Sequence, residues 1–427
     1  MKCRNCKNKR FNKIIKIGNQ PISSSTLKKK INLKKYPLDL YKCNKCDLIQ
    51  LSKVAPSNQM YGESYGYWTG LSKLMINHMK KKVKWLIKTN KLNKNSSVLD
   101  IGCSDPTFLN LLNQTKKKLN LFAIDPSSEK FRATFEKNRI NLIVDYFSKK
   151  KIEKYQEANH LTKKKFSLIT SFAMFYDIDN PNQFCKDINS LLSKKGIWIV
   201  EFSYFPLLLR NLTFDQINHE HVTYYTLTTF NKILKKNGLE ILDVNFNEIN
   251  GGSAEVVVAK KNMHKKNNLK KIQDIFVQEK KINDNSYQKF GTRLQNIKKV
   301  INNFLENNKS KKIIGYGAAT KGNIILNYCN IKNKSIKFIS DGNKRKWGRY
   351  TPGSNIRIIS KEKMRKIKPD YLFVLIWSFR SEVIRQEKAY LMRGGKLIIP
   401  LPIFHIIDKD NYQLFLDKKL EEFGYNI

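Results

Sequence analysis

Alternating strand and helix patterns in the middle of the chain are the feature that most narrows its fold. The stretch SSVLDIGCSDPTFLNLL, residues 96–112, has an apolar run that ends at Asp100, a turn through Gly102 and then a helical pattern. Such a unit presents backbone N–H groups and a glycine to a cofactor at the carboxyl end of a parallel sheet. A dinucleotide site would carry GxGxxG, and this turn has only one of those glycines, so we do not expect nicotinamide binding here.

A second strand pattern, LNLFAIDPSSEK, follows roughly twenty residues later and ends in Asp125. At the tip of the second strand, a carboxylate can accept hydrogen bonds from the two hydroxyls of a ribose. A simple strand-end cap is the alternative role for this residue. Its distance from the first unit favours the ribose role.

A third pattern covers residues 166–205, FSLITSFAMFYDIDNPNQFCKDINSLLSKKGIWIVEFSYF. It predicts a strand at 167–172, a loop, a helix at 183–192 and a strand at 197–202. Gly196 follows the end of that helix, where a glycine commonly stands. The alternation of strands and helices predicts a doubly wound parallel α/β sheet.

The cysteines are concentrated near the start of the chain. Four of the seven form the pairs CRNC and CNKC, at Cys3, Cys6, Cys43 and Cys46. Two CxxC pairs predict a four-thiolate zinc site, because each pair brings two sulfurs to one tetrahedral ion. All four positions come from protein, so we expect a structural ion. A redox CxxC is the alternative, although that motif opens a helix after a strand and needs no second pair.

Composition limits the choice of partner and compartment. The net charge is +46, but the lysines are spread along all 427 residues together with many Asn and Ile, which is typical of a global bias. We therefore expect no specific nucleic-acid partner, although a basic surface attracts anionic small molecules. The start, MKCRNCKNKR, has no apolar h-region and no apolar run is long enough to span a bilayer, so we expect a cytoplasmic protein. This length predicts two or three domains.

A second anion-binding pattern lies in the C-terminal part. KKIIGYGAATKGNIILNYC predicts a strand, a turn through Gly315 and Gly317, and a helix from about Thr320, whose first N–H groups can face an anion. Lys321 adds a positive charge at this turn. We expect Gly317 and Lys321 to hold the diphosphate of a nucleotide, the alternative being a Rossmann-like fold that only packs. Later apolar runs, KSIKFISD, PDYLFVLIW and GGKLIIP, predict further strands of this α/β layer.

DIGCSDP resembles the first motif of class I S-adenosylmethionine (SAM) methyltransferases, in which an acidic residue and a glycine approach the methionine part of the cofactor. SFAMFYDIDNP, residues 171–181, resembles the loop after the fourth strand of that fold, which lines the cofactor. The residues that this resemblance places against SAM are Asp100, Gly102, Ser104, Asp105, Asp125 and Ala173.

Further segments stand out beside the cysteine pairs: ESYGYWTG at 63–70, NHEHVTYYTL at 218–227, NGGSAEVVVAK at 250–260, GYGAATKGN at 315–323 and DGNKRKWGRYTPG at 341–353. Together they resemble the sugar-nucleotide C-methyltransferases, which act in the biosynthesis of branched deoxysugars, and the similarity covers essentially the entire chain. It implies a zinc-binding domain over 1–60, a class I SAM methyltransferase domain over 61–262, and a Rossmann-like substrate-binding domain over 263–427.

FDQINHEHVTYY, residues 214–225, places His219 and His221 on either side of Glu220. The zinc-protease signature needs His at i and i+4, so this i, i+2 pair is not that motif. In the family that the chain resembles, the segment lies at the active site and its second His is the base. The resemblance therefore implies that His221 removes a proton beside a ketone, for which a neutral imidazole is suited, and that Glu220 helps to hold the sugar. We expect His219 to face the other way.

Two departures from the family pattern affect the expected site. Many members carry Tyr immediately before His-Glu-His, where this chain has Asn218, and the family's NDG turn is SDP here, at 104–106. A hydrogen bond to the enolate oxygen would then come from Asn218 or from a phenol of Tyr67, Tyr224 or Tyr225. Both changes leave the reaction class unchanged.

The resemblance implies a SAM-dependent C-methyltransferase that acts on a keto-deoxysugar linked to a nucleoside diphosphate, as a monomer or homodimer. O- or N-methylation, or C-methylation of another carbonyl compound, is the first alternative. The second is a non-enzymatic protein that binds nucleic acid through a zinc knuckle, which predicts strongly salt-dependent retention on DNA or RNA.

Overall fold

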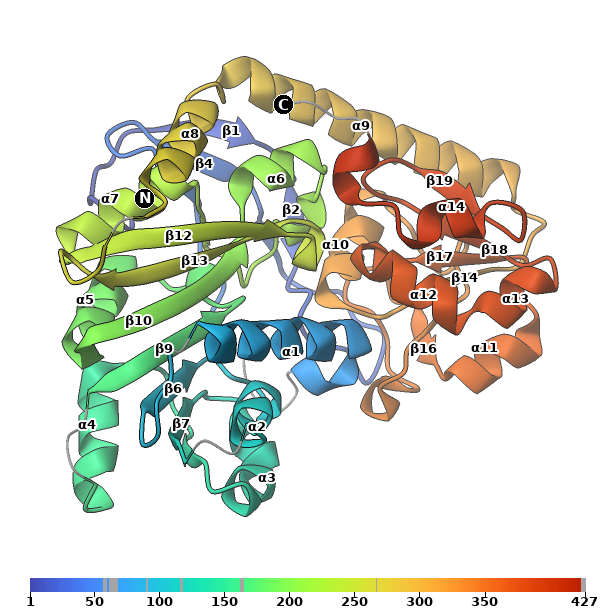
Figure 1. The fold of residues 1–427 in the computed structure, drawn as a ribbon. Coiled ribbons are helices and arrows are strands. Elements are labelled where there is room, and N and C mark those ends of the chain that lie inside the picture. The colour runs from blue at the N-terminus through green and yellow to red at the C-terminus, as the bar shows by residue number, and fades with distance from the viewer. Residues whose placement is uncertain are drawn as a thin grey trace.

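The largest element of the fold is a mixed seven-stranded sheet in the middle of the chain (Figure 1). The computed structural model describes residues 1–56, 60, 68–89, 91–115, 118–161, 165–265 and 267–423. In order across the sheet, the strands are β12 (Leu239–Asn247), β13 (Ser253–Lys260), β10 (Leu192–Ser203), β9 (Phe166–Phe172), β6 (Ser97–Ile101), β7 (Asn120–Ile124) and β8 (Asn141–Ile143). β10, β9, β6, β7 and β8 are parallel, whereas β13 is antiparallel to both β10 and β12. The predicted doubly wound α/β sheet is confirmed.

Helices cover both faces of this sheet because its strands bury side chains on both sides. All five residues of β6 are buried, a pattern typical of a parallel strand between two helical layers. The helices on one face are α1 (Lys73–Lys88), α2 (Thr107–Asn113) and α3 (Arg132–Lys137). The helices on the other face are α4 (Lys149–Ala158), α5 (Pro181–Leu191), α7 (Leu227–Lys236) and α8 (Leu269–Glu279).

Helix α5 begins slightly earlier than the apolar pattern indicates. The Asn180 side chain accepts a hydrogen bond from the Gln183 N–H at 3.2 Å, and Pro181 occupies the first turn, where a missing N–H costs nothing. Strand β10 also begins earlier, at Leu192, with a register shift against β9 before Ile197. The predicted order of strand, helix and strand is confirmed.

The N-terminal residues form two small sheets. The first contains β1 (Phe11–Ile15), β4 (Leu40–Cys43), β5 (Ile49–Leu51) and β11 (Thr223–Tyr224), and the second pairs β2 (Asn19–Pro21) with β3 (Lys35–Pro37). β11 is distant in sequence, and it pairs antiparallel with β5 so that Thr223 lies opposite Gln50. The segment just after His-Glu-His is therefore attached to the N-terminal sheet.

The C-terminal residues form a six-stranded sheet that is parallel except at one edge. Its strands, in order, are β16 (Arg357–Ile359), β15 (Phe338–Ser340), β14 (Ile313–Tyr316), β17 (Tyr371–Val374), β18 (Lys396–Ile399) and β19 (His405–Ile407). The helices of this part are α9 (Asp284–Asn307), α10 (Thr320–Tyr328), α11 (Lys361–Ile367), α12 (Arg380–Gln386), α13 (Lys388–Met392) and α14 (Tyr412–Leu416). The predicted strands and the helix from Thr320 are confirmed.

One hydrophobic core joins the N-terminal sheet to the C-terminal sheet. It contains Leu40 of β4, Phe205 of α6 (Phe205–Arg210) and Ile314 of β14. In Figure 1, α9 runs along the outside from the N-terminal sheet and α6 towards the C-terminal sheet. The domain boundaries at residues 60 and 262 stay predictions. Among the described residues, no helix is long and apolar enough to cross a membrane.

Candidate active site

The four N-terminal cysteines meet at one point. All four Sγ atoms lie within 4.8 Å of one another, with Cys3 Sγ 3.5 Å from Cys46 Sγ and Cys6 Sγ 3.6 Å from Cys43 Sγ. Tetrahedral zinc with Zn–S bonds of about 2.3 Å needs sulfurs about 3.8 Å apart, so the arrangement fits a four-thiolate zinc ion. Protein ligands fill every position, as a structural ion requires.

The zinc cluster is connected to the His-Glu-His segment through a short run of backbone. Cys43 ends β4, Cys46 follows in the turn, and β5 then pairs with β11, which begins two residues after His221. The Leu51 N–H donates to the Val222 carbonyl at 3.1 Å, and the Val222 N–H donates to the Tyr176 carbonyl at 3.0 Å. The zinc-binding part therefore holds the segment that contains His221.

Three carboxylates lie together at the carboxyl ends of β6 and β7. Asp100 accepts a hydrogen bond from Thr170 Oγ1 at 2.7 Å, and burial raises its pKa to about 7, with Asp125 and Asp105 adding to the effect. Each of these buried charges disfavours the others. A cationic ligand would relieve this repulsion, so the set fits a cofactor that carries a sulfonium and an ammonium group.

Asp125 is more fully hydrogen-bonded than the sequence indicates. Its Oδ2 accepts from the Ser104 N–H at 3.0 Å, and its Oδ1 accepts from both the N–H and the hydroxyl of Ser127, at 2.6 and 2.7 Å. A carboxylate oxygen has two lone pairs, so Oδ2 retains one for a ligand hydroxyl. Asp125 therefore closes the turn, and its expected contact with a ribose hydroxyl stays a prediction.

The other residues predicted for the cofactor site are Asp105, Gly102 and Ala173. Asp105 accepts from the Gly70 N–H at 2.7 Å and from the Thr107 N–H at the start of α2 at 3.2 Å, so it joins two segments. Gly102 has φ +70°, and a Cβ there would lie 2.8 Å from Met174 Cγ, which only glycine avoids. Ala173 also has a positive φ, +54°, and lines the cleft described next. Such backbone strain is concentrated at functional sites.

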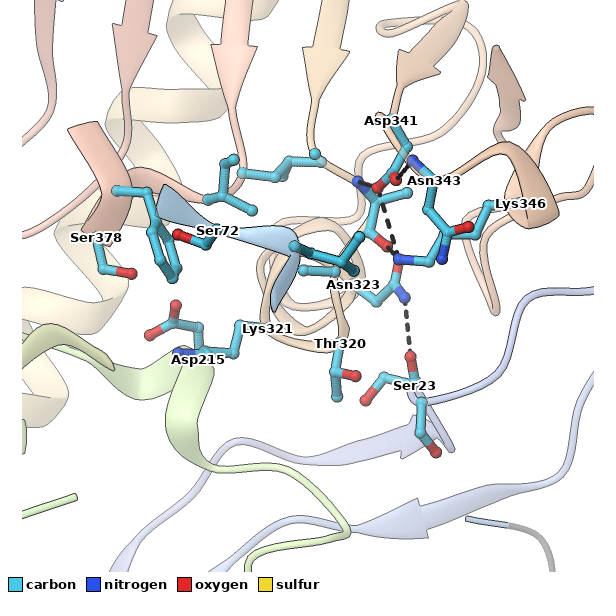
Figure 2. A pocket seen from close by; sticks show the side chains of 18 of the residues that line it. Ser23, Ser72, Asp215, Thr320, Lys321, Asn323, Asp341, Asn343, Lys346 and Ser378 are labelled. Atoms are coloured by element: carbon cyan, nitrogen blue, oxygen red, sulfur yellow. Dashed lines mark hydrogen bonds and ion pairs between the residues drawn. The ribbon is translucent and has the colours of Figure 1, made fainter. Parts of the chain in front are cut away.

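A cleft of about 520 Å³ lies where the three parts of the chain meet. It is lined by Ser23 and Ser24 from the N-terminal part, by the loop after β9 with Tyr176, and by the end of β14 with the start of α10. The segment around His-Glu-His contributes Asp215, Gln216, Asn218, Glu220 and His221. Figure 2 shows Ser23, Asp215 and Lys321 around this space. Since every part contributes to the wall, the cleft exists only in the assembled fold.

His221 lies in the cleft wall with its two ring nitrogens in different surroundings. Nδ1 is 2.8 Å from the Gln216 carbonyl oxygen, which can only accept, so Nδ1 carries the hydrogen. Nε2 therefore has the free lone pair. The Tyr176 ring packs against the imidazole with ring centroids 4.0 Å apart. Burial, with a smaller contribution from the Lys321 ammonium, lowers the pKa of His221 to about 3, so the ring is neutral near pH 7.

Two carboxylates and one ammonium group line the cleft together with His221. Burial raises the pKa of Glu220 to about 7, and the nearby Ser24 hydroxyl and Lys321 lower it. Burial likewise raises the pKa of Asp215 to about 6, although Asp215 Oδ2 accepts from the Trp377 indole N–H at 2.8 Å. Lys321 has its pKa lowered to about 8 by burial, against the opposing effects of these two carboxylates.

Several polar atoms of the cleft have no hydrogen-bond partner among the described residues, although they are buried. An unsatisfied buried polar group costs about 1–3 kcal/mol, so such groups are typical of a site that awaits a ligand. Four of these atoms can accept a hydrogen bond from a ligand and are called the acceptor set: Ser23 Oγ, Asp215 Oδ1, Glu220 Oε1 and Asn323 Oδ1.

The C-terminal wall of the cleft carries positive charge. Its basic set consists of Arg345, Lys346, Arg349 and Lys361. At the turn after β14, the Ala318 N–H donates to Asp341 Oδ2 at 2.8 Å, and Lys346 Nζ donates to the Ala318 carbonyl at 2.8 Å. Gly317 has φ +89°, and a Cβ there would lie 2.6 Å from Ile376. No side chain in the described part of the chain caps the start of α10, so its first N–H groups are available to an anion.

The structure separates the other residues predicted for the site. Asn218 lines the cleft, but its Oδ1 accepts from the Glu220 N–H at 2.9 Å and its Nδ2 donates to the Gln216 carbonyl at 3.3 Å, so its amide holds the loop.

Tyr224 is buried away from the cleft lining, and its hydroxyl donates to the Gln216 carbonyl at 3.4 Å. His219 faces away, with Nε2 3.3 Å from the Tyr36 carbonyl. Tyr67 lies outside the described residues.

Sequence reasoning did not single out four contributors to the cleft: Ser23, Tyr176, Asp215 and Asn323. Tyr176, Asp215 and Asn323 lie inside segments named above, at 171–181, 214–225 and 315–323, but no role was assigned to them, and Ser23 belongs to none of these segments. Asp215 reaches the site through a contact with Trp377, 162 positions away, and Asn323 Nδ2 donates to the Ser23 carbonyl at 2.9 Å across 300 positions. For the basic set, the sequence does contain an indication, because the run KRKWGR at 344–349 concentrates basic residues in one short segment.

Three family models match this chain in succession. A zinc binding domain matches residues 3–61, a methyltransferase domain matches 75–244, and a C-methyltransferase C-terminal domain matches 248–402. Among curated proteins, the C-methyltransferase NovU of Streptomyces niveus is 26% identical over 417 residues, which are 96% of this chain and 97% of NovU.

Solved structures with a similar arrangement match less than half of the chain. The mitomycin 7-O-methyltransferase MmcR has a TM-score of 0.35 at 10% identity, over 44% of this chain and 55% of MmcR. An S-adenosylmethionine-dependent methyltransferase of Clostridium acetobutylicum has a TM-score of 0.33 at 15% identity, over 43% of this chain and 92% of that one.

Proposed function

Because this chain belongs to the SAM-dependent C-methyltransferases with an N-terminal zinc-binding domain and a C-terminal C-methyltransferase domain, we propose that it methylates a carbon next to the ketone of a sugar linked to a nucleoside diphosphate. Its middle part has the class I SAM methyltransferase fold, and its cofactors are SAM and structural zinc. Nucleotide-sugar binding and the His221 base are the parts of this proposal that need support from the cleft.

The lining of the cleft is the observation that carries the substrate class. The acceptor set offers two carboxylate oxygens, an amide oxygen and a hydroxyl without partners, which suits a ligand with several O–H donors. The basic set and the uncapped start of α10 suit a diphosphate. A nucleotide sugar combines both chemistries in one molecule.

Carbon methylation requires a carbon nucleophile. His221 Nε2 has its lone pair directed away from the Gln216 hydrogen bond, so it can take the proton from the carbon next to the ketone. The electron pair of that C–H bond then forms the C=C bond of an enolate, and the carbonyl π electrons move to oxygen. The cleft wall holds the sugar while this charge develops.

SAM, when bound, supplies an electrophilic methyl group to the enolate carbon and is released as S-adenosylhomocysteine without needing an acid. Residues that would hold it are Asp100, Asp105 and Asp125, whose mutual repulsion favours a cationic ligand. Gly102 and Ala173 shape the backbone around that position. Ala173 also lines the cleft, which supports a short path between the two ligands.

Mass spectrometry of nucleotide sugars tests the proposal. The purified protein is incubated with SAM and a panel of 4-keto-6-deoxyhexoses carried on different nucleoside diphosphates, beside His221→Ala and the matched control His219→Ala. We expect a gain of one methyl group on a keto sugar with the wild-type protein and His219→Ala, and no gain with His221→Ala. Methyl transfer to a hydroxyl or amine acceptor that survives His221→Ala would favour O- or N-methylation instead.

A further inference from the structure

The position of Lys321 at the α10 turn indicates a role in binding a diphosphate. Its side chain, however, lies in a different part of the site. It is the second residue of α10, and its Nζ donates to Asn250 Oδ1, 2.7 Å away in the turn between β12 and β13. In Figure 2 its side chain extends towards Asp215, whereas Asp341, Asn343 and Lys346 gather on the other side of the helix start. The ammonium group is thus directed at the His-Glu-His loop.

The charges around this ammonium group disfavour a diphosphate ligand. Asp215 and Glu220 line the same cleft as Lys321, and both raise its pKa against the effect of burial. A diphosphate brought to the same point would meet their negative charge, and like charges in a partly buried site repel strongly. The residues of the basic set are better placed for phosphate oxygens.

The position of the Lys321 ammonium group suits a single substrate oxygen that becomes negatively charged only during the reaction. An ammonium group has three N–H donors, and among the described residues one hydrogen bond from Lys321 is found, to Asn250. Lys321 is half-buried and lines the same cleft as His221.

We propose that the Lys321 ammonium donates to the ketone oxygen of the substrate and stabilises the negative charge that forms there when His221 removes the adjacent proton. This rests on the proposed function. The proton moves from carbon to His221 Nε2, the C–H electron pair becomes the C=C bond, and the carbonyl π pair moves onto the oxygen that faces Lys321. Asp215 and Glu220 keep the ammonium group charged, and Asn250 orients it.

Proton exchange separates this role from substrate binding. The keto sugar is incubated in D₂O with the protein but without SAM, and the deuterium gained at the carbon next to the ketone is followed by mass spectrometry. Lys321→Met is expected to lower the exchange rate at saturating substrate, and the methyl-transfer rate, by about 100-fold or more. Its affinity for uridine and thymidine diphosphate is expected to stay close to that of the wild-type protein.

Two further variants complete the test. Lys321→Ala should regain part of its exchange rate when propylamine is added, because the small amine can occupy the vacated space. Lys332→Met, which changes an exposed lysine, serves as the control for loss of a positive charge. Weakening of nucleoside diphosphate binding by about tenfold in Lys321→Met, with exchange at saturation unchanged, would overturn the proposal. A wild-type protein that exchanges no proton on any keto sugar would instead overturn the proposed function.

Discussion

The Nδ1 atom of His221 lies 2.8 Å from the carbonyl oxygen of Gln216. Because a carbonyl only accepts, this contact selects the imidazole tautomer whose Nε2 has a free lone pair. The acceptor is backbone, so side-chain substitution at Gln216 does not remove it. The orientation of the base is therefore a property of the loop that runs from Gln216 to His221.

His221→Ala should lower methyl transfer by about 10²–10⁴-fold, the usual effect of losing a general base. His219→Ala should keep activity within about tenfold, because His219 faces Tyr36 and is absent from the cleft lining. Steady-state rates with SAM-binding titrations check both variants. Equal losses in the two variants, with SAM binding intact, would contradict the assignment of the base.

Removal of zinc should reduce activity by moving His221. The zinc-binding turn leads directly into β5, which pairs with β11 just after His221. We expect Cys43→Ser to lose most of its methyl transfer, to retain SAM binding, and to show faster hydrogen exchange at the amides of β11. A variant that loses zinc but keeps slow exchange and full activity would show that the two sites are independent.

The plot of kcat/KM against pH should be bell-shaped, with an acid limb near about pH 7 and an alkaline limb near about pH 8. Its acid limb follows Glu220, whose pKa is raised to about 7, so activity that needs the ionised carboxylate falls as pH decreases through that value. Its alkaline limb follows Lys321, whose pKa is lowered to about 8, so activity that needs the ammonium group falls above it. His221, with a pKa of about 3, should add no limb in this range.

Two variants identify the limbs. Glu220→Gln should remove the acid limb and leave the alkaline limb. Lys321→Met should have a much lower reaction rate, and its pH profile should lack the alkaline limb. An acid limb that persists unchanged in Glu220→Gln would assign it to another group, with Asp215, whose pKa is raised to about 6, as the next to test.

The Trp377 indole should stabilise the fold through Asp215. Its N–H donates to Asp215 Oδ2 at 2.8 Å, and both residues are buried. Trp377→Phe leaves that oxygen without a partner and should lower the free energy of unfolding by about 1–3 kcal/mol. Urea unfolding of Trp377→Phe, Asp215→Asn and the double variant measures the coupling between the two residues. Additive losses would show that the hydrogen bond contributes nothing to stability.

Local sequence patterns predicted much of the fold. The strand ending near Asp100, the turn at Gly102 and the helix from Thr107 form a contiguous unit, so apolar periodicity and one glycine were sufficient to find it. The helix from Thr320 was found in the same way. The pairing of Thr223 with Gln50 had no such signal, because a two-residue strand has no periodicity and its partner lies far away in the chain.

The same limit applies to the site. CxxC spacing predicted a cysteine cluster that the structure brings together, and resemblance directed attention to His221. The contribution of Ser23 to the cleft, and the direction of Lys321, depend on how three parts of the chain pack, which no local pattern describes. Tyr224 looked suitable beside His221 in the sequence, but β-strand pairing turns it into the core.

The central claim is that a carbon atom of a keto sugar receives the methyl group. NMR spectroscopy of the product formed with ¹³C-methyl SAM tests this most directly, because it identifies the atom to which the labelled methyl is bonded. We expect the label on the ring carbon next to the ketone, with the hydrogen of that carbon lost, and no labelled product from His221→Ala. A label bonded to oxygen or nitrogen, or a labelled product from His221→Ala at the wild-type rate, would contradict the account.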